Sequence, residues 1–230
     1  KRYVNSKIYL FIILIFLILL ILVFKNSHNC KIDNIQPNLV NENITEPSKE
    51  EIKPITFTMT ALGDSLCHNT QYWDAYNKET GKYDFSYVYE DIKQYTQSSD
   101  ITIGSLETTF AGEERGYSNY PTFNTPDSLA TALKNIGVDI ISLAGNHALD
   151  YGYSGLCRTI DVLDSAGISH LGTYKTAEDQ KKLLIKNVNG LEIAFINYTY
   201  GTNGIPVPSG KDYCVNLIDK TLIKEQIEEA

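Results

Sequence analysis

The sequence predicts an α/β fold whose mainly parallel sheet carries the side chains of a binding site along one edge. Two observations support this. Short apolar, β-branched runs alternate with stretches of helical spacing between residues 55 and 198, which is typical of parallel strands joined by helices. Several of these runs end in small and polar residues, at the carboxyl edge where open α/β sheets bind their ligands. With 230 residues, the chain is long enough to bury the core of one such domain.

The expected strands and helices follow one another in regular order. Apolar residues that alternate with hydroxyl residues or form short runs indicate strands, and apolar residues recurring every three or four positions indicate helices. The expected strands are 55–62, 100–103, 140–144 and 168–171, and the expected helices are 87–97, 126–136, 153–166 and 176–182. Gly167 suits a helix end. The Asn-Gly pair at 189–190 predicts a hairpin. It joins residues 182–188 to residues 191–198, so some antiparallel pairing is expected.

The N-terminal part of the sequence predicts a membrane anchor. Residues 8–24 form an unbroken apolar run of about 17 residues, close to the minimum for a helix that spans a bilayer. More basic residues precede the run than follow it closely, so the positive-inside rule places residues 1–7 in the cytoplasm. No small-x-small cleavage site follows, which favours an uncleaved anchor over a signal peptide. We therefore expect a single-pass protein of the cell membrane. Residues 25–54 would be a flexible extracytoplasmic linker, and residues 55–230 the folded domain.

The acidic composition limits the partners that the chain can have. A net charge of −8 and a pI near 5.0 argue against a general nucleic-acid-binding surface, so no nucleic acid partner is expected. An anionic substrate would need a local cation, either a metal ion or an arginine, to overcome the repulsion. The four cysteines lack the CxxC spacing of a zinc or redox site and are expected to be unpaired.

Side chains that can bind a cation or move a proton follow three successive expected strands. They are Asp64 and His68 after the first strand, Glu107 after the second, and Asn146, His147 and Asp150 after the third. Taken alone, each is explained equally well by an ordinary turn, a helix cap or a core histidine. Taken together, oxygen ligands and imidazole at one sheet edge favour Mn, Mg, Fe or Zn in a water-activating role.

The same residues belong to an ordered series of motifs. In chain order these are Gly63-Asp64 with His68, Leu106-Glu107-Thr108-Thr109, Tyr120 to Pro126, Asn146-His147 with Asp150-Tyr151-Gly152, and Tyr198 to Gly201 with Asn203. The series resembles the CapA family of poly-γ-glutamate capsule biosynthesis proteins, whose domain is similar to the calcineurin-like metallophosphoesterases. The resemblance implies a metallophosphoesterase-like sandwich of two mixed sheets flanked by helices, with metals at the strand ends. The family's later histidine motifs have no counterpart here, so the domain is expected to be incomplete at its C-terminal end.

The resemblance also implies a role for each site residue. The ligands of one or two divalent metal ions would be Asp64, His68, Glu107 and Asn146. His147 would protonate the leaving group, and Asp150 would orient it. Arg115 is the candidate to clamp an anionic substrate, although a solvated loop arginine is the alternative, and Asn124 is a second substrate-binding candidate.

By resemblance, the chain is expected to be an anchored, extracytoplasmic, metal-dependent hydrolase or transferase in the synthesis or export of poly-γ-glutamate or a related envelope polymer. Its partners would be the membrane, the anionic polymer and membrane subunits of a synthase or export complex. Two alternatives stay open. The domain could be a non-catalytic docking or polymer-guiding subunit of such a complex, or a general metallophosphoesterase. Metal content and turnover separate the three.

Overall fold

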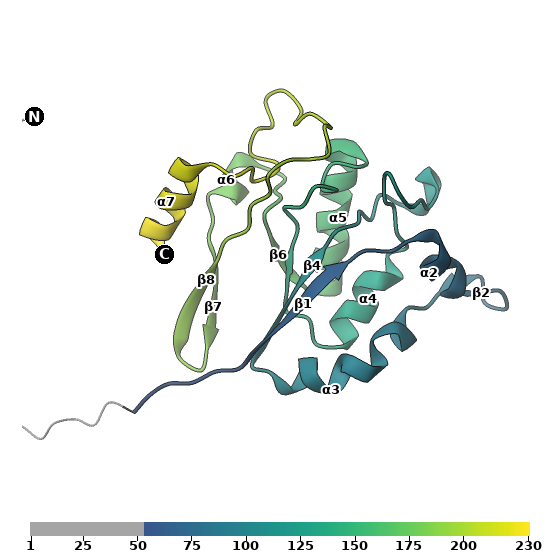
Figure 1. Ribbon diagram of the computed structural model, residues 1–230, viewed down its shortest axis with the longest axis horizontal. Coiled ribbons are helices and arrows are strands. Elements are labelled where there is room, and N and C mark those ends of the chain that lie inside the picture. The colour runs from purple at the N-terminus through teal and green to yellow at the C-terminus, as the bar shows by residue number, and fades with distance from the viewer. Residues whose placement is uncertain (1–52) are drawn as a thin grey trace, which may run out of the picture. The chain divides into compact units, whose positions relative to one another are not determined.

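The computed structural model describes residues 53–230 (Figure 1). The expected anchor at residues 8–24, and all but the end of the expected linker at residues 25–54, lie outside the described residues. None of the helices within residues 53–230 has the length and apolar character needed to cross a membrane.

A four-stranded parallel sheet forms the centre of the domain (Figure 1). In spatial order its strands are β1 (Met59–Ser65), β4 (Ile101–Leu106), β5 (Ile140–Ser142) and β6 (Ser169–Leu171). Both isoleucines of β5 are buried, as expected for an inner strand covered on both faces. Because the strands are parallel, their carboxyl ends all reach the same edge of the sheet.

Helices cover one face of this sheet (Figure 1). The main ones are α3 (Glu90–Ser98), α4 (Ser128–Asn135) and α5 (Gly152–Ala166). Leu133 of α4 and Leu163 of α5 are fully buried in one hydrophobic cluster with Ile141 of β5. Gly167 ends α5 with a positive φ of 68°, which is the usual conformation of a glycine at this position. The sequence pattern therefore identified these helices correctly.

The remaining helices and strands outside the central sheet and its hairpin complete the domain. They are α2 (Asn69–Asp74), β2 (Tyr76–Asn77), β3 (Lys82–Tyr83), η1 (Ser86–Tyr89), η2 (Glu113–Arg115), α6 (Ala177–Gln180) and α7 (Lys220–Glu229).

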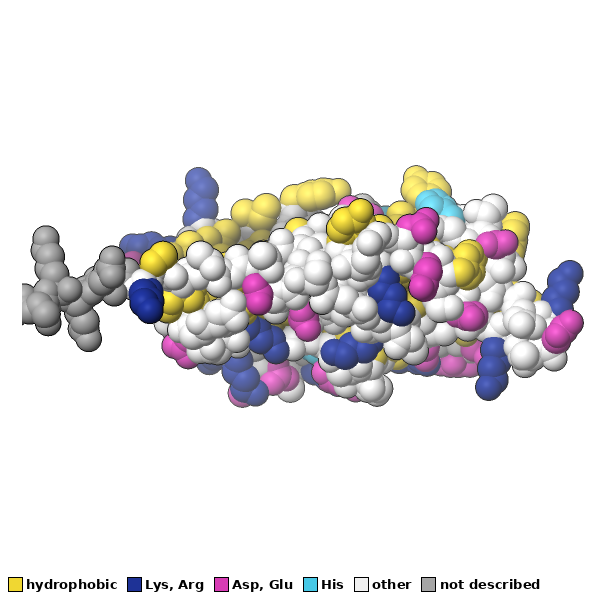
Figure 2. All heavy atoms as spheres, turned by 90° about the horizontal axis from the view of Figure 1, so that it is seen from below, with side chains coloured by type: hydrophobic (Ala, Val, Ile, Leu, Met, Phe, Trp, Pro, Cys, Tyr) yellow, Lys and Arg dark blue, Asp and Glu magenta, His cyan; other side chains and the backbone are white. Residues whose placement is uncertain are grey.

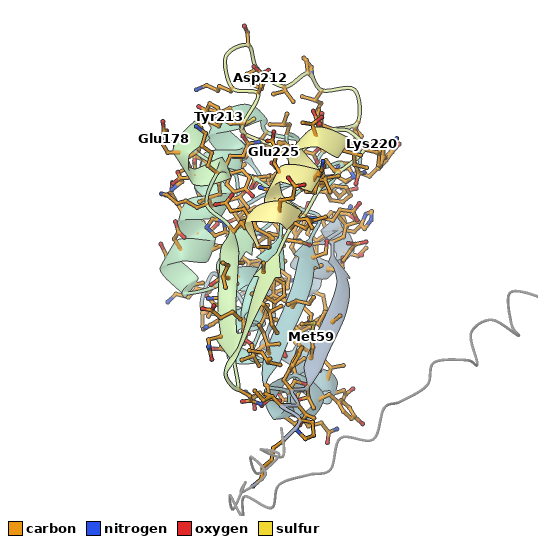
Figure 3. All side chains as sticks on the ribbon, turned by 90° about the vertical axis from the view of Figure 1, so that its left-hand side faces the viewer. Met59, Glu178, Asp212, Tyr213, Lys220 and Glu225 are labelled. Atoms are coloured by element: carbon orange, nitrogen blue, oxygen red, sulfur yellow. The ribbon has the colours of Figure 1, made fainter. Side chains whose placement is uncertain are left out.

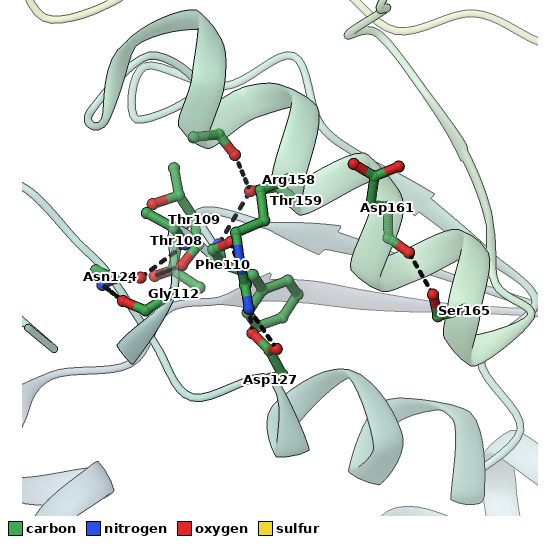
Figure 4. A network of polar contacts seen from close by, with 12 residues as sticks. Thr108, Thr109, Phe110, Gly112, Asn124, Asp127, Arg158, Thr159, Asp161 and Ser165 are labelled. Atoms are coloured by element: carbon green, nitrogen blue, oxygen red, sulfur yellow. Dashed lines mark hydrogen bonds and ion pairs between the residues drawn. The ribbon is translucent and has the colours of Figure 1, made fainter. Parts of the chain in front are cut away.

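An ion pair joins two of the main helices. Arg158 of α5 forms two hydrogen bonds with Asp127 at the start of α4, at 2.7 and 2.8 Å (Figure 4). A paired guanidinium and carboxylate fix the relative orientation of their two elements.

An antiparallel hairpin of β7 (Leu184–Val188) and β8 (Leu191–Phe195) packs on the opposite face of the sheet. Its buried contact with the sheet is made by Ile101, Ile140, Leu171 and Val188. Figure 3 shows the hairpin in front of the sheet. Met59 lies toward the lower end of the sheet in this view, and Tyr213 lies on the loops above the hairpin. The hairpin predicted from the Asn-Gly pair is thereby confirmed, and Asn189 has the positive φ (54°) that such a turn requires.

The α/β class is confirmed, but the expectation of two mixed sheets is wrong for residues 53–230. The four-stranded sheet is wholly parallel and the hairpin wholly antiparallel. The reason lies in the connections. Long crossovers lead from β1 to β4, from β4 to β5 and from β5 to β6, whereas the two-residue turn at 189–190 permits only an antiparallel return.

The hairpin shields the middle of the sheet but leaves the β1 edge open. Met59 lies opposite the buried Ile101 in the β1–β4 register, yet it is 40% exposed. Ile185 of the hairpin is also exposed. Figure 2 shows hydrophobic side chains along the upper rim of the view, above a face on which acidic and basic side chains are interspersed.

Candidate functional site

Two of the predicted acidic residues lie at neighbouring strand ends. Asp64 is opposite Ser105 in the β1–β4 register, and the backbone N–H of Glu107 donates to the carbonyl of Ser65 at 3.1 Å. Asp64 is exposed and Glu107 is half-buried. The sheet therefore brings both residues to the carboxyl edge, as the sequence predicts.

His147 and Asp150 form a hydrogen-bonded pair at the end of β5. Nδ1 of His147 lies 2.8 Å from Oδ2 of Asp150, and the two side chains are only 9% and 1% exposed. The same Oδ2 accepts the backbone N–H of Phe123 at 2.7 Å, whereas Oδ1 is buried without a partner among the described residues. Burial raises the pKa of Asp150, and the hydrogen bonds from Phe123 and His147 offset this only in part. The carboxylate thus fixes one ring nitrogen and leaves Nε2 on the other side of the ring.

The local sequence explains how this pair forms. Residues 145–152 make consecutive tight turns, in which Ala148 donates to Gly145, Asp150 to His147 and Gly152 to Leu149. In each turn a backbone N–H bonds the carbonyl three residues earlier. The side chain of Asp150 is thereby placed next to the ring of His147. Gly152 has a φ of 63°, a conformation that glycine adopts at no steric cost, and α5 begins there.

One buried aromatic ring joins the two predicted histidines. The ring of Phe123 is 1% exposed and lies edge-on to His147 at a centroid distance of 4.7 Å and to His68 at 5.1 Å. His68 precedes α2, and its backbone N–H donates to Oε1 of Gln71 at 2.6 Å. Edge-on aromatic contacts are favourable, so Phe123 sets the spacing of the two imidazoles.

Asn124 is fully buried and shapes the loop that carries Arg115. Its Oδ1 accepts the N–H of Ala111 at 2.7 Å, and its Nδ2 donates to the carbonyls of Gly112 and Gly116 at 2.8 Å each. Figure 4 shows Asn124 beside Gly112. Its polar atoms therefore hold backbone, and direct contact of Asn124 with a substrate stays a prediction.

Arg115 reaches the rim of the site from this loop. Its Nη2 donates to Oγ of Ser154 at 2.9 Å, and its Nη1 to the carbonyl of Tyr151 at 3.3 Å. Tyr151 directly follows Asp150, so the exposed guanidinium lies close to the start of α5. An anionic substrate would have to compete with these two contacts, and a clamping role for Arg115 stays a prediction.

Asn203 also contacts the site, although no role for it was predicted from the sequence. Its Nδ2 lies 3.4 Å from both ring nitrogens of His147. Its Oδ1 accepts from Nδ2 of Asn146 at 3.3 Å. A signal for this residue was present, because Asn203 belongs to the last motif of the resemblance, but nothing in the local sequence showed which residues it would meet.

Of the predicted metal ligands, Asp64 and Glu107 are the two that the sheet brings to one edge. Among residues 53–230, no three His, Cys, Asp or Glu side chains lie close enough together to hold a metal ion. His68 packs on Phe123, and the amide of Asn146 is bonded to Asn203. In this arrangement the residues present do not fit a complete metal site, and divalent metal binding stays a prediction.

Comparison with known proteins identifies the family. The family model described as bacterial capsule synthesis protein PGA_cap matches residues 58–230. The chain belongs to this family. The resemblance to CapA proteins is confirmed by two further similarities of this PGA_cap chain. It is 28% identical over 149 residues to the capsule biosynthesis protein CapA of Bacillus anthracis, which covers 62% of this chain and 34% of that protein. It is 24% identical over 115 residues to the PGA biosynthesis protein CapA of Bacillus subtilis, which covers 49% and 30%.

A shorter similarity extends beyond the bacilli. A probable polyglutamine synthesis accessory protein of Mycobacterium tuberculosis is 34% identical over 77 residues, covering 33% of this PGA_cap chain and 20% of that protein. The chain therefore spans about a third or less of the length of these relatives.

Proposed function

We propose that this PGA_cap chain acts in the synthesis or export of an anionic envelope polymer such as poly-γ-glutamate. Membership of the family supports the proposal, as do the names of the relatives, which describe capsule or PGA biosynthesis. The acidic net charge of the chain means that such a polymer has to be drawn in by local groups, and Arg115 at the rim of the site is the candidate for this.

Within this role, His147 would be the proton donor of a hydrolase or transferase. The observation that carries this is the 2.8 Å contact between Nδ1 of His147 and the buried Asp150. A histidine held at Nδ1 presents Nε2 to a substrate. In hydrolysis, water adds to the attacked carbon or phosphorus and releases one proton to the solvent. The bond to the leaving oxygen or nitrogen breaks, the leaving atom takes the proton from Nε2, and Nε2 regains a proton from the solvent.

We also propose that the domain lies outside the cell, anchored by residues 8–24. The apolar run and the excess of basic residues before it support this orientation. It would place the strand-end site on the side of the membrane where an envelope polymer is found, beside the membrane subunits of its synthase. Protease added to intact cells is expected to cleave within the linker at residues 25–54 and to leave residues 1–7 protected. Cleavage of both ends would contradict the orientation.

The function is tested by turnover on a γ-glutamyl polymer, measured as release of new amino ends. His147→Gln is expected to lower turnover at least about 100-fold, the usual contribution of a positioned proton donor. His170→Gln is the matched control, because His170 in β6 bonds Asp164 and has no part in the site. Turnover that survives His147→Gln would contradict the proton-donor role.

The same experiment decides between the alternatives. Binding of poly-γ-glutamate without turnover, unchanged by His147→Gln, would support a docking or polymer-guiding subunit. Turnover of a simple phosphomonoester with no action on the polymer would support a general phosphoesterase.

A further inference from the structure

The segment that follows β8 is fastened across the end of β5 by asparagine side chains. Oδ1 of Asn197 accepts the N–H of Ala144 at 2.6 Å. At Gly172, beside this contact, an added Cβ would lie 2.2 Å from the same Oδ1, so only glycine leaves room for it. The segment therefore cannot move freely relative to the loop that carries Asn146 and His147.

Asn203 lies in a tight turn at the far end of this segment. Asn203 and Gly204 have φ values of 52° and 78°, and the N–H of Ile205 donates to the carbonyl of Thr202 at 2.9 Å. Positive φ at both central residues is the pattern of a type I′ turn, for which Asn-Gly is a preferred pair. The turn alone thus explains an asparagine here, but it does not explain what the side chain contacts.

The turn at Asn189-Gly190 provides the comparison within the same chain. Asn189 and Gly190 have φ values of 54° and 92°, so the backbone is nearly the same. The amide of Asn189 donates to the carbonyl of Thr56 at 3.0 Å, which precedes β1, whereas Asp64 lies at the carboxyl end of that strand. The amide of Asn203 instead contacts Asn146 and His147.

The position of the Asn203 amide relative to the ring of His147 leaves Nε2 of that ring accessible. Nδ2 is equally distant, 3.4 Å, from Nδ1 and Nε2. Because Cε1 lies between these nitrogens, an amide in the ring plane at that position would press against Cε1. Nδ2 therefore lies over the face of the ring, and the in-plane direction of Nε2 is not blocked by it.

We propose that Asn203 is a positioning residue that holds His147 by the face of its ring while its carbonyl oxygen holds the amide of Asn146. The inference rests on the proposed proton-donor role of His147. Asp150 fixes Nδ1, Asn203 prevents the ring from tilting, and Nε2 stays directed at the substrate. Groups that hold a functional side chain in this way commonly contribute tenfold or more to activity.

The test compares Asn203→Gly with Asn189→Gly in the full chain. Glycine accepts a positive φ at least as well as asparagine, so both variants keep their turns, and only Asn203→Gly loses the contact with His147. The ring C–H signals of His147, assigned in NMR spectra with His147→Gln, are expected to shift in Asn203→Gly and to stay in place in Asn189→Gly. Identical His147 signals in the two variants would overturn the inference.

Kinetics supply the second readout. Asn203→Gly is expected to lower kcat about tenfold with little change in KM, because the substrate still binds but meets a less ordered ring. Asn203→Asp, which keeps the oxygen that accepts from Asn146 and tolerates the same backbone conformation, is expected to recover part of the loss. Shifted His147 signals with unchanged kcat would overturn the positioning role. If the wild-type chain shows no turnover, the proposed function fails, while the ring signals still decide whether Asn203 holds His147.

Discussion

The carboxyl group of Asp150 is almost wholly buried, and only its Oδ2 has hydrogen-bond partners among the described residues. Its pKa is raised by burial from an ordinary value of 3.8. The folded chain therefore holds this proton more tightly than the unfolded chain does. The stabilisation that results is fully present below the ordinary pKa and is lost as the pH rises through the raised one.

Asp150→Asn is predicted to remove this pH dependence. The free energy of unfolding of the wild type relative to the variant should fall as the pH rises from about 4 toward neutrality. Urea denaturation of both proteins at several pH values measures this difference. Repeating the pair in a His147→Gln background removes the titration of the histidine from the comparison. A difference that is constant, or that grows with pH, would show that burial does not dominate at Asp150.

At the scale of elements, the crossing of the segment after β8 over the end of β5 depends on Gly172. Its φ is 94°, and an added Cβ would lie 2.7 Å from the backbone nitrogen of Ala144 and 2.2 Å from Oδ1 of Asn197. The backbone of Ala144 and the amide of Asn197 are hydrogen-bonded to each other, so neither can move away from an added Cβ without a cost in free energy. Gly172→Ala is therefore expected to lower the free energy of unfolding by about 1–3 kcal/mol.

Gly201→Ala is the matched control for Gly172→Ala. A Cβ at Gly201 meets nothing within 4 Å, and its backbone lies outside the positive-φ region. Its effect should stay within about 0.5 kcal/mol. Chemical denaturation of the two variants under the same conditions measures both values, and equal effects would mean that the close approach at Gly172 carries no cost.

Elements that are determined by neighbouring residues in the sequence could be predicted, whereas those that depend on contacts between distant segments could not. The Asn189-Gly190 hairpin follows from residues within a few positions and was predicted from them, whereas the pairing of His147 with Asp150 was implied by the family resemblance. The first strand was expected at residues 55–62 but lies at Met59–Ser65. Its pairing begins beside Thr58, whose backbone N–H donates to Asp100 at 2.7 Å, a contact that no local pattern reveals.

The candidate site shows the same limit. Phe123 and Asn203 reach His147 from segments 24 and 56 positions away along the chain. A single sequence contains the turn preferences of such segments but not the places where they meet. The hydrogen bonds that occupy Asn124 and Arg115 likewise became visible only in the folded domain.

At the scale of the whole molecule, the parallel sheet decides how much of a metal site the described domain can offer. The strand ends bring Asp64 and Glu107 to one edge, yet within residues 53–230 no third His, Cys, Asp or Glu side chain joins such a pair closely enough to hold a metal ion. Two carboxylates in contact with water bind a hard divalent cation weakly, because ligand number and a fixed geometry supply most of the affinity.

The chain is therefore predicted to bind at most one Mn²⁺ ion, weakly, and to lose this binding on Asp64→Asn. Because the net charge of −8 attracts cations without specificity, titration calorimetry should be run at about 0.15 M salt, where exposed charges are largely screened. Glu225 lies on α7 (Figure 3), so Glu225→Gln removes the same charge away from the strand ends and should leave the titration unchanged. Tight binding of two ions, with loss on Asp64→Asn but not on Glu225→Gln, would mean that the loops after β1 and β5 rearrange around metal. His68 and Asn146 would then have to leave Phe123 and Asn203 to become ligands.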